Sequence, residues 1–362
     1  MGAPHPPWLC ALLFPAGLLY RGGVEVRNFL YRRGALPTRR LPAAVLSVGN
    51  LTMGGSGKTP FVAYLAGQFR ESGRRVAVVS RGYGGASHPT PLVVSKGTGP
   101  LVTAAEAGDE PVLLSQILPA VVVIVCRDRW SAGRLASERF GSDLILLDDG
   151  YQHRRLARDF DLLLVDAGRG FGNGRMPPCG PLREPLRELA RCDALVVTGS
   201  ADQTHQGAAQ ARKVLTHLGL SKPVFRCERR CDGFSRLDSA ERLAPEALNG
   251  MKAVAFSGIA HPEGFESDLR SLGVKLVDSV RFRDHQPLGP RELARVAESV
   301  KRARPEVLVT TEKDRARLGT LRMPLPTFTL RIRMAPVEEN ELMALVKQRL
   351  SGVDFSARAE NP

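Results

Sequence analysis

Short apolar runs alternate with segments of helical length along most of the chain. The first runs lie at 45–48, 76–80, 121–125, 144–147, 162–165 and 194–197. Segments of helical length separate them, for example at 61–72 and 131–140. Strands that are apolar at nearly every position are buried on both faces, which is typical of a parallel sheet covered by helices on its two sides. The pattern therefore predicts an α/β fold.

A second set of apolar runs begins after a polar stretch at 199–207. These runs lie at 253–257, 274–280, 307–310 and 327–330, and a helical pattern at 290–303 falls between them. We expect the polar stretch to be a linker and the second set to form a smaller α/β domain. The predicted organisation is a membrane-associating segment at 1–40, a main domain at 41–204, the smaller domain at 205–350 and a tail at 351–362.

The N-terminus combines an apolar segment with an arginine-rich one. The apolar run at 8–20 is interrupted by Pro15 and Gly17 and is too short to span a membrane, which takes about 20 residues. From Arg21 to Arg40 there are six arginines and one acid, Glu25, with apolar residues between them. This composition suits a helix that lies in the interface of an anionic membrane. The alternative is a helix that packs on the protein's own core.

The charge balance favours an anionic partner without identifying it. The 362 residues include 51 Lys and Arg against 37 Asp and Glu, a net charge of +14. Nucleic acid, anionic lipid and a phosphorylated substrate are all compatible with that charge. The six cysteines are scattered and complete no zinc-binding pattern, which indicates a reducing, cytoplasmic setting.

The segment from Val45 to Pro60 has the order of a P-loop. An apolar run leads into a glycine-rich turn that closes on Gly-Lys-Thr. Glycines let backbone N–H groups approach a polyphosphate, and the N-terminus of the following helix attracts the same anion. The lysine would reach the β- and γ-phosphates, and the threonine hydroxyl would face Mg²⁺. The alternative is an ordinary glycine-rich connection, since Thr52 replaces the usual first glycine. The predicted nucleotide-binding residues are Asn50, Thr52, Gly54, Gly55, Ser56, Gly57, Lys58 and Thr59.

Two other strand ends carry polar residues where ligands bind in open α/β sheets. Arg81 follows the run at 76–80. The run at 144–147 continues into Asp148 and Asp149, which is the form of a Walker B strand whose carboxylates hold Mg²⁺. Gln152 and His153 come next, and the histidine is either a substrate contact or a solvated loop residue.

Candidate acid–base residues lie in two further segments. Asp109 and Glu110 precede Pro111 and an apolar run. They read either as the start of a helix, with Asp109 as its N-cap, or as a carboxylate that accepts the proton of an attacking hydroxyl. Asp284 and His285 form the second segment, where an acid beside an imidazole is a common acid–base device or an incidental pair.

The stretch 172–185 is too rich in glycine and proline for the interior of a helix or strand. It carries Arg175, Arg183 and Glu184, which suit recognition of a polar, anionic ligand. The alternative is a tight structural connection. The stretch Thr310–Asp314 (TTEKD) lacks the asparagine and the spacing of a guanine-binding motif, so we do not expect guanine recognition.

Taken together, these segments resemble the tetraacyldisaccharide 4'-kinase family, the lipid A 4'-kinases. The resemblance rests on SVGNLTMGGSGKTP, SRGYGG, GDEPVLL, CRDR, LDDGYQHRRLARDFDLLLVDA, PPCGPLREP, FRDHQ and TTEKD, which occur in family order over about residues 8–315. It implies a P-loop fold and transfer of the ATP γ-phosphate to the 4'-hydroxyl of a tetraacylated glucosamine disaccharide 1-phosphate. It also implies work at the cytoplasmic face of the inner membrane, as a peripheral or monotopic protein.

The resemblance also implies roles for single residues. Asp109 matches the proposed base and His285 its partner, with Asp284 beside it, and Lys58 binds the phosphates. The expected Mg²⁺ ligands are Thr59, Asp148, Asp149 and Glu110. The expected substrate-binding residues are His153, Gln152, Arg81, Arg183 and Glu184.

We expect the partners to be the acylated disaccharide lipid and an anionic membrane surface, with no nucleic acid and no obligate protein partner. Two alternatives stay open. One is a soluble P-loop kinase of a small metabolite, which would not need residues 1–40. The other is a nucleotide-dependent membrane switch that hydrolyses ATP slowly and phosphorylates nothing.

Overall fold

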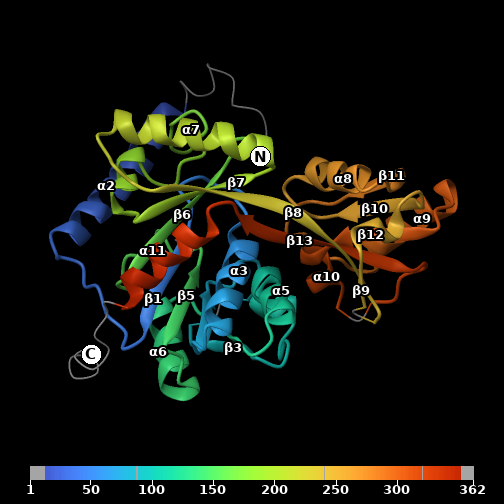
Figure 1. Cartoon of the computed structure of the whole chain (residues 1–362), viewed down its shortest axis with the longest axis horizontal. Coiled ribbons are helices and arrows are strands. Elements are labelled where there is room, and N and C mark those ends of the chain that lie inside the picture. The colour runs from blue at the N-terminus through green and yellow to red at the C-terminus, as the bar shows by residue number, and fades with distance from the viewer. Residues whose placement is uncertain (1–12, 87–88, 240, 320, 352–362) are drawn as a thin grey trace.

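One continuous β-sheet runs through both halves of the molecule (Figure 1). The computed structural model describes residues 13–86, 89–239, 241–319 and 321–351. These residues form a sheet of 13 strands in the order β11-β10-β12-β13-β8-β7-β6-β1-β5-β2-β4-β3, with β9 beside β8. We call the half that contains the glycine-rich loop the P-loop lobe and the other half the distal lobe.

The P-loop lobe is a mainly parallel sheet. Its strands are β1 (Ala44–Gly49), β2 (Val76–Ser80), β3 (Leu92–Lys96), β4 (Val122–Val125), β5 (Leu144–Asp148), β6 (Phe160–Asp166) and β7 (Ala194–Gly199). Strand β1 lies at the centre between β5 and β6 and is parallel to both, whereas β3 at the edge is antiparallel to β4. Val48 of β1 is in register with Asp148 of β5, so the glycine-rich loop and the acidic strand end lie at the same edge of the sheet.

Helices cover both faces of this sheet, as the apolar strands predict. They are α3 (Lys58–Glu71), α4 (Ala104–Ala107), α5 (Asp109–Ile117), α6 (Arg129–Phe140), α7 (Ala201–His217) and α11 (Glu339–Ser351), with a short 3-10 helix η1 (Leu186–Arg191). Leu46 packs on one face with α3, α5 and α11, and Val45 packs on the other face with α6. The expected P-loop-like α/β fold is therefore confirmed.

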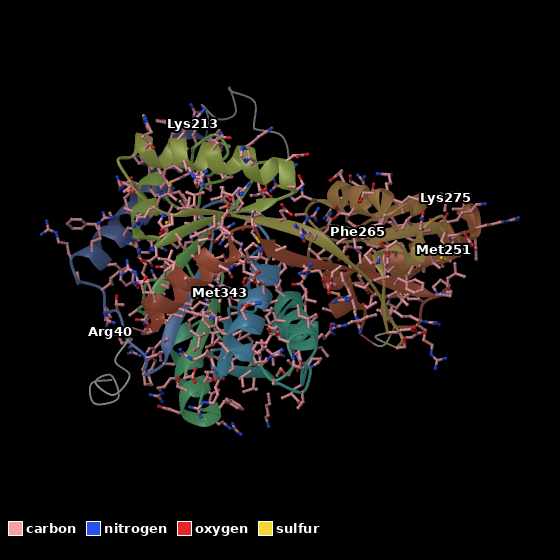
Figure 2. All side chains as sticks on the ribbon, in the orientation of Figure 1. Arg40, Lys213, Met251, Phe265, Lys275 and Met343 are labelled. Carbon is pink, nitrogen blue, oxygen red and sulfur yellow. The ribbon has the colours of Figure 1, made fainter. Side chains whose placement is uncertain are left out.

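The distal lobe repeats the same layering on a smaller scale. Its elements are β9 (Arg242–Leu243), η2 (Pro245–Leu248), β10 (Lys252–Ser257), α8 (Pro262–Ser271), β11 (Lys275–Arg281), α9 (Pro290–Ala303), β12 (Val307–Thr311) and α10 (Glu312–Leu318). Phe265 of α8, labelled in Figure 2, packs on one face of the sheet, and Val296 of α9 packs on the other.

Two long strands, β8 (Val224–Arg236) and β13 (Thr327–Pro336), join the lobes. They are antiparallel to each other, from Phe328 opposite Arg236 to Pro336 opposite Cys227. The start of β8 pairs with β7, and the start of β13 pairs with β12. Figure 1 shows both strands crossing from the P-loop lobe to the distal lobe.

The observed boundaries differ from the predicted ones in two places. The predicted linker at 199–207 is the end of β7 and the first turns of α7, which Ser200 and Gln203 begin with a capping box. Helix α11, expected in the smaller domain, packs on the P-loop lobe through Leu342 and Met343 (Figure 2). The order of elements along the chain does not show that α11 lies on the P-loop lobe, because β13 first carries the chain back from the distal lobe. The predicted tail lies outside the described residues, apart from Ser351.

Helix α2 (Phe14–Arg32) lies against the P-loop lobe with one side and leaves apolar side chains on the other. Asn28 is fully buried, and its carbonyl accepts a hydrogen bond of 3.0 Å from Arg154 Nη1. The exposed large apolar side chains of α2 are Phe14, Leu18, Leu19, Tyr20, Val26 and Phe29. Within the described residues, no helix is long and apolar enough to cross a membrane. Residues 8–12 of the predicted apolar run lie outside that part.

Candidate active site

The glycine-rich loop connects the end of β1 to the start of α3, as predicted. Gly57 precedes the helix in a left-handed conformation (φ 75°), and no side chain caps the N-terminal N–H groups of α3. Those N–H groups are therefore left for an anion. Lys58 Nζ donates to Asn50 Oδ1 at 3.2 Å and lies 3.6 Å from Asp149 Oδ1. Thr59 is buried in the first turn of α3.

The first part of the loop is tied to the segment 181–183. Met53 N donates to Pro181 O at 2.7 Å, and Arg183 N donates to Leu51 O at 2.7 Å. Thr52 forms an isolated antiparallel bridge with Leu182. This pairing explains why Thr52 can replace a glycine, since extended backbone there suits a β-branched residue.

A cavity of about 310 Å³ opens beside the loop, between the two lobes. Gly54 lines it at a φ of 105°, and a Cβ there would lie 2.9 Å from Arg169 Nη1. The remaining lining residues are Arg169, Ile259, Ala260, His261, Arg283 and Asp284. Gly55 is exposed, whereas Ser56 is buried and its hydroxyl has no hydrogen-bond partner.

The two strand-end carboxylates have different surroundings. Asp148 is buried, and neither of its carboxylate oxygens has a hydrogen-bond partner. Burial, with the nearby charges of Glu110 and Asp149, raises the pKa of Asp148 to about 7. Burial also acts on Asp149, but Lys58 and Arg183 outweigh it and lower the pKa of Asp149. Arg183 Nη1 contacts both oxygens of Asp149, at 2.9 and 2.7 Å.

These surroundings fit a divalent cation in part. A buried carboxylate without a hydrogen-bond donor is suited to a metal ion, and Thr59 offers a hydroxyl in the first turn of α3, which begins at the same edge of the sheet. The described residues contain no group of three or more His, Cys, Asp or Glu side chains arranged to hold a metal. Glu110, the fourth predicted ligand, forms an ion pair of 3.0 Å with Lys313. Mg²⁺ usually takes one or two carboxylates and completes its shell with phosphate and water, so a site with few protein ligands is compatible with this ion.

Asp109 and His285 meet across the two lobes. Asp109 is the first residue of α5, and Gly108, not Asp109, holds the N-cap position. His285 follows β11 in the distal lobe, and its Nδ1 lies 3.2 Å from Asp109 Oδ1 and 3.1 Å from Oδ2. His285 Nε2 lies 3.7 Å from Asp284 Oδ2. The contact to Asp109 raises the pKa of His285, despite partial burial.

Asp109 stays ionised although it is buried. Burial works to raise its pKa, but the hydrogen bond to His285 and the charges of Lys313 and Arg317 lower it. Lys313 Nζ lies 4.0 Å from Asp109 Oδ2. The sequence alone did not identify Lys313 or Arg317 as site residues, although the signal was a charged turn at the end of the apolar run 307–310.

The residues expected to bind the acceptor fall into two places. Gln152 Nε2 donates to Asn50 O at 2.9 Å, and Arg183 Nη1 donates to Gln152 Oε1 at 3.4 Å, so both lie beside the loop and Asp149. His153 lies farther along, 4.0 Å from Asp128 Oδ1. Burial, together with the charge of Arg129, lowers the pKa of His153 to about 4, and the imidazole is neutral at pH 7.

Two arginines frame this edge of the sheet. Arg81 is exposed directly after β2, where the sequence predicted it. Arg129, at the start of α6, was missed, although it belongs to the CRDR motif. Burial lowers the pKa of Arg129 to about 10, against the favourable charges of Asp149 and Asp148. Arg129 therefore adds a buried positive charge beside the two carboxylates.

Glu184 is held by ion pairs within the protein. Its side chain is fully buried and forms ion pairs with Arg27 of α2, at 2.6 Å, and with Arg191. Both carboxylate oxygens are thus used inside the protein. Glu184 thus joins α2 to the P-loop lobe, and its expected role in substrate binding stays a prediction.

Comparison with known proteins shows the family of this chain. A family model described as Tetraacyldisaccharide-1-P 4'-kinase (LpxK) matches residues 9–351. The chain is 40% identical to the tetraacyldisaccharide 4'-kinase of Syntrophus aciditrophicus over 94% of this chain and 92% of that protein. It is also 40% identical to the enzyme of the same name from Geobacter sulfurreducens, over 94% of each chain.

A solved structure is similar along nearly its full length. The crystal structure of LpxK from Aquifex aeolicus, described as an "apo" form in complex with ATP, superposes with a TM-score of 0.76 at 33% identity. The match covers 94% of this chain and 99% of that one.

Proposed function

The chain belongs to the tetraacyldisaccharide-1-P 4'-kinase family, and from that premise we propose how its side chains carry out the reaction. It is a lipid A 4'-kinase, which transfers the γ-phosphate of ATP to the 4'-hydroxyl of a tetraacyldisaccharide 1-phosphate. The contact between Asp109 of the P-loop lobe and His285 of the distal lobe carries the proposal.

The P-loop holds the donor. The uncapped N-terminus of α3 and Lys58 bind the phosphates, and Asn50 keeps the lysine extended along the loop. Arg183, which also donates to Gln152 Oε1, holds Asp149 in place beside the lysine. Phosphoryl transfer depends mainly on positioning and on neutralising charge, and these contacts supply both.

Asp109 accepts the proton of the acceptor. As the 4'-oxygen forms its bond to the γ-phosphorus, the bond to the β–γ bridging oxygen breaks and ADP leaves. The hydroxyl proton passes to Asp109, which is ionised at neutral pH. His285 orients that carboxylate through Nδ1, and Asp284 lies on the other side of the imidazole.

Asp148 and Thr59 are the residues that would hold Mg²⁺, with Asp149 and Glu110 as further candidates. When bound, the ion would neutralise charge on the β- and γ-phosphates. The support for this assignment is the buried, unpartnered carboxylate of Asp148.

The exposed apolar side of α2 supports a position at a membrane surface. The acyl chains of the acceptor stay in the bilayer, so the site has to reach the headgroup layer. Phe14, Leu18 and Leu19 are 61%, 52% and 79% exposed, and such side chains are stable when buried in a lipid interface. We place the protein at the cytoplasmic face of the inner membrane, where ATP is present.

The test supplies the purified full-length protein with labelled ATP and the disaccharide 1-phosphate lipid in detergent. We expect one added phosphate on the lipid, and Asp109→Asn should lower kcat by about 10²–10⁴-fold, the usual contribution of a general base. Lys58→Ala should weaken ATP use as well. Full activity of Asp109→Asn in a folded protein would exclude it as the base, and hydrolysis without lipid product would favour a nucleotide switch.

A further inference from the structure

Arg317 of α10 is a buried cation for which the mechanism above has no use. Its side chain is only 5% exposed and lies in the distal lobe, although it faces Asp109 of the P-loop lobe. A buried arginine is costly unless each of its donors has a partner. The partners of Arg317 therefore indicate its purpose.

The guanidinium is held mainly by backbone carbonyls. Its Nη1 donates to Gln286 O at 3.1 Å, and its Nη2 donates to Gly258 O at 2.7 Å. These carbonyls belong to the turn that carries His285 and to the residue after β10. Arg317 thus connects α10, the end of β10 and the histidine turn within one lobe.

Asp314 forms an ion pair with Arg317. It is fully buried in the same helix, and its Oδ1 lies 3.1 Å from Arg317 Nη2 and accepts a hydrogen bond of 3.0 Å from Gly258 N. Thr311 Oγ1 donates to the other carboxylate oxygen. Arg317 has little freedom to turn, which suits a residue that positions others.

The histidine turn needs such support. His285 has a left-handed backbone (φ 59°), which is unfavourable for a residue with a Cβ and persists only when neighbouring contacts enforce it. Gln286 N donates to Arg283 O at 3.0 Å, and Gln286 Oε1 accepts from Arg283 N at 3.1 Å. The bond from Arg317 to the Gln286 carbonyl is the contact that joins this turn to α10.

Arg317 also faces the partner of the histidine. Its Nε lies 3.6 Å from Asp109 Oδ2, the carboxylate oxygen that has no hydrogen-bond partner. The distance permits charge attraction without a hydrogen bond, so Oδ2 remains able to accept a proton. The other charged groups around the pair are Lys313, Glu110 and Asp284, and Tyr83 packs edge-on against His285.

We propose that Arg317 is a positioning residue for the transfer step: from the distal lobe it sets the turn that carries His285 and attracts Asp109 to it. This inference rests on the proposed roles of Asp109 and His285. Arg317 need not touch either substrate. Its effect should therefore fall on kcat and leave nucleotide binding by the P-loop unchanged.

The experiment compares Arg317→Gln and Arg317→Lys with Arg315→Gln and Arg315→Lys in the full-length protein. Arg315 lies on the same helix, and its Nη1 donates to Ser235 Oγ at 3.1 Å, away from the pair. Measured quantities are kcat, KM for ATP, KM for the lipid and the thermal unfolding midpoint.

We expect Arg317→Gln to lower kcat by about 10²-fold, as small misplacements of reacting groups do. KM for ATP should change by less than about threefold, because uniform binding is not altered. The kcat of Arg317→Lys should be at least about tenfold higher than that of Arg317→Gln. Both Arg315 variants should have the kcat of the parent protein.

A double-substitution cycle separates this inference from the proposed function. If Arg317 acts through His285, then adding Arg317→Gln to His285→Ala should cost less than about threefold in kcat. Full multiplication of the two effects would overturn the positioning role, and so would a kcat of Arg317→Gln equal to the parent. Losses that follow only the unfolding midpoint, with no rescue by lysine, would also overturn it. If instead Asp109→Asn and His285→Ala keep full activity, the proposed function of the pair fails by itself.

Discussion

At the scale of single residues, Asp148 and Asp109 are two buried carboxylates with opposite shifts of pKa. Asp148 has no hydrogen-bond donor, and burial leaves its pKa at about 7. Asp109 faces an imidazole and two cations that more than offset burial, so its pKa is lowered. Two carboxylates with opposite pKa shifts are suited to different roles. Asp148 is suited to bind a cation, and Asp109 is suited to accept a proton.

The raised pKa of Asp148 predicts a pH-dependent metal requirement. Below pH 7 the carboxyl is protonated in the folded protein, and Mg²⁺ has to displace that proton. From pH 8 to pH 6 we expect the Mg²⁺ concentration for half-maximal ATP binding to rise by about tenfold. Titrations with a fluorescent nucleotide measure this Mg²⁺ concentration. The Asp148→Asn variant shows how much of the pH dependence comes from the titration of ATP itself. An equal pH dependence in the two proteins would contradict the prediction.

The buried ion pairs of Glu184 predict a loss of stability when this side chain is removed. Removing Glu184 leaves Arg27 without its ion pair and Arg191 with Glu188 alone, whereas breaking a fully buried pair typically costs about 3–5 kcal/mol. Arg27 is 39% exposed, so we expect Glu184→Ala to lower the free energy of unfolding by about 2–4 kcal/mol. Denaturant unfolding measures it. Glu25→Ala, which removes more exposed pairs with Arg21 and Arg187, should cost below about 1 kcal/mol.

At the scale of elements, α2 has two distinct sides. Ion pairs to Glu184 and Glu188 attach one side to the P-loop lobe, and the other side exposes apolar residues. The packing interpretation describes the attached side, whereas the membrane interpretation stays a prediction for the exposed side. The hydrophobic pattern predicted the exposed side, but the docking contacts join residues more than 150 positions apart, and local patterns carry no information on such pairs.

The exposed side of α2 should bind lipid. Leu19→Glu together with Val26→Glu removes apolar area and adds charge, so co-sedimentation with vesicles of anionic phospholipid should fall by at least tenfold. Thermal stability should stay unchanged, because both side chains are exposed. Val277→Glu, at an exposed apolar position on β11, serves as the control. Unchanged sedimentation of the double variant would exclude α2 as the lipid-binding surface.

At the scale of the whole molecule, the sequence predicted the layers and most of the site, but not their assembly. Strands, the P-loop and the acidic strand end follow from local patterns and from spacing. Lys313 and Arg317 were missed because their partner Asp109 is about 200 residues away in the chain. The return of α11 was missed for a related reason: an amphipathic helix fits any apolar sheet face, and only tertiary packing selects one.

The packing of α11 on the P-loop lobe predicts which part of the molecule it stabilises. Leu342 is fully buried there, so Leu342→Ala should lower the free energy of unfolding by about 2–5 kcal/mol, as for other large core side chains. Glu341→Ala, at an exposed position of the same helix, should cost below about 0.5 kcal/mol. Denaturant titrations with and without ATP measure both. Equal costs for the two variants would contradict this packing.

The antiparallel pairing of β8 with β13 makes the distal lobe an insertion into the P-loop lobe. The chain leaves the P-loop lobe near Arg229 of β8 and re-enters it near Met334 of β13, and these two residues are directly opposite each other in the sheet. All residues between these positions therefore belong to a module whose two ends are adjacent in the sheet. A module with adjacent ends can be exchanged by recombination without changing the strand order of its host. The distal lobe can therefore diverge while the P-loop lobe keeps its core.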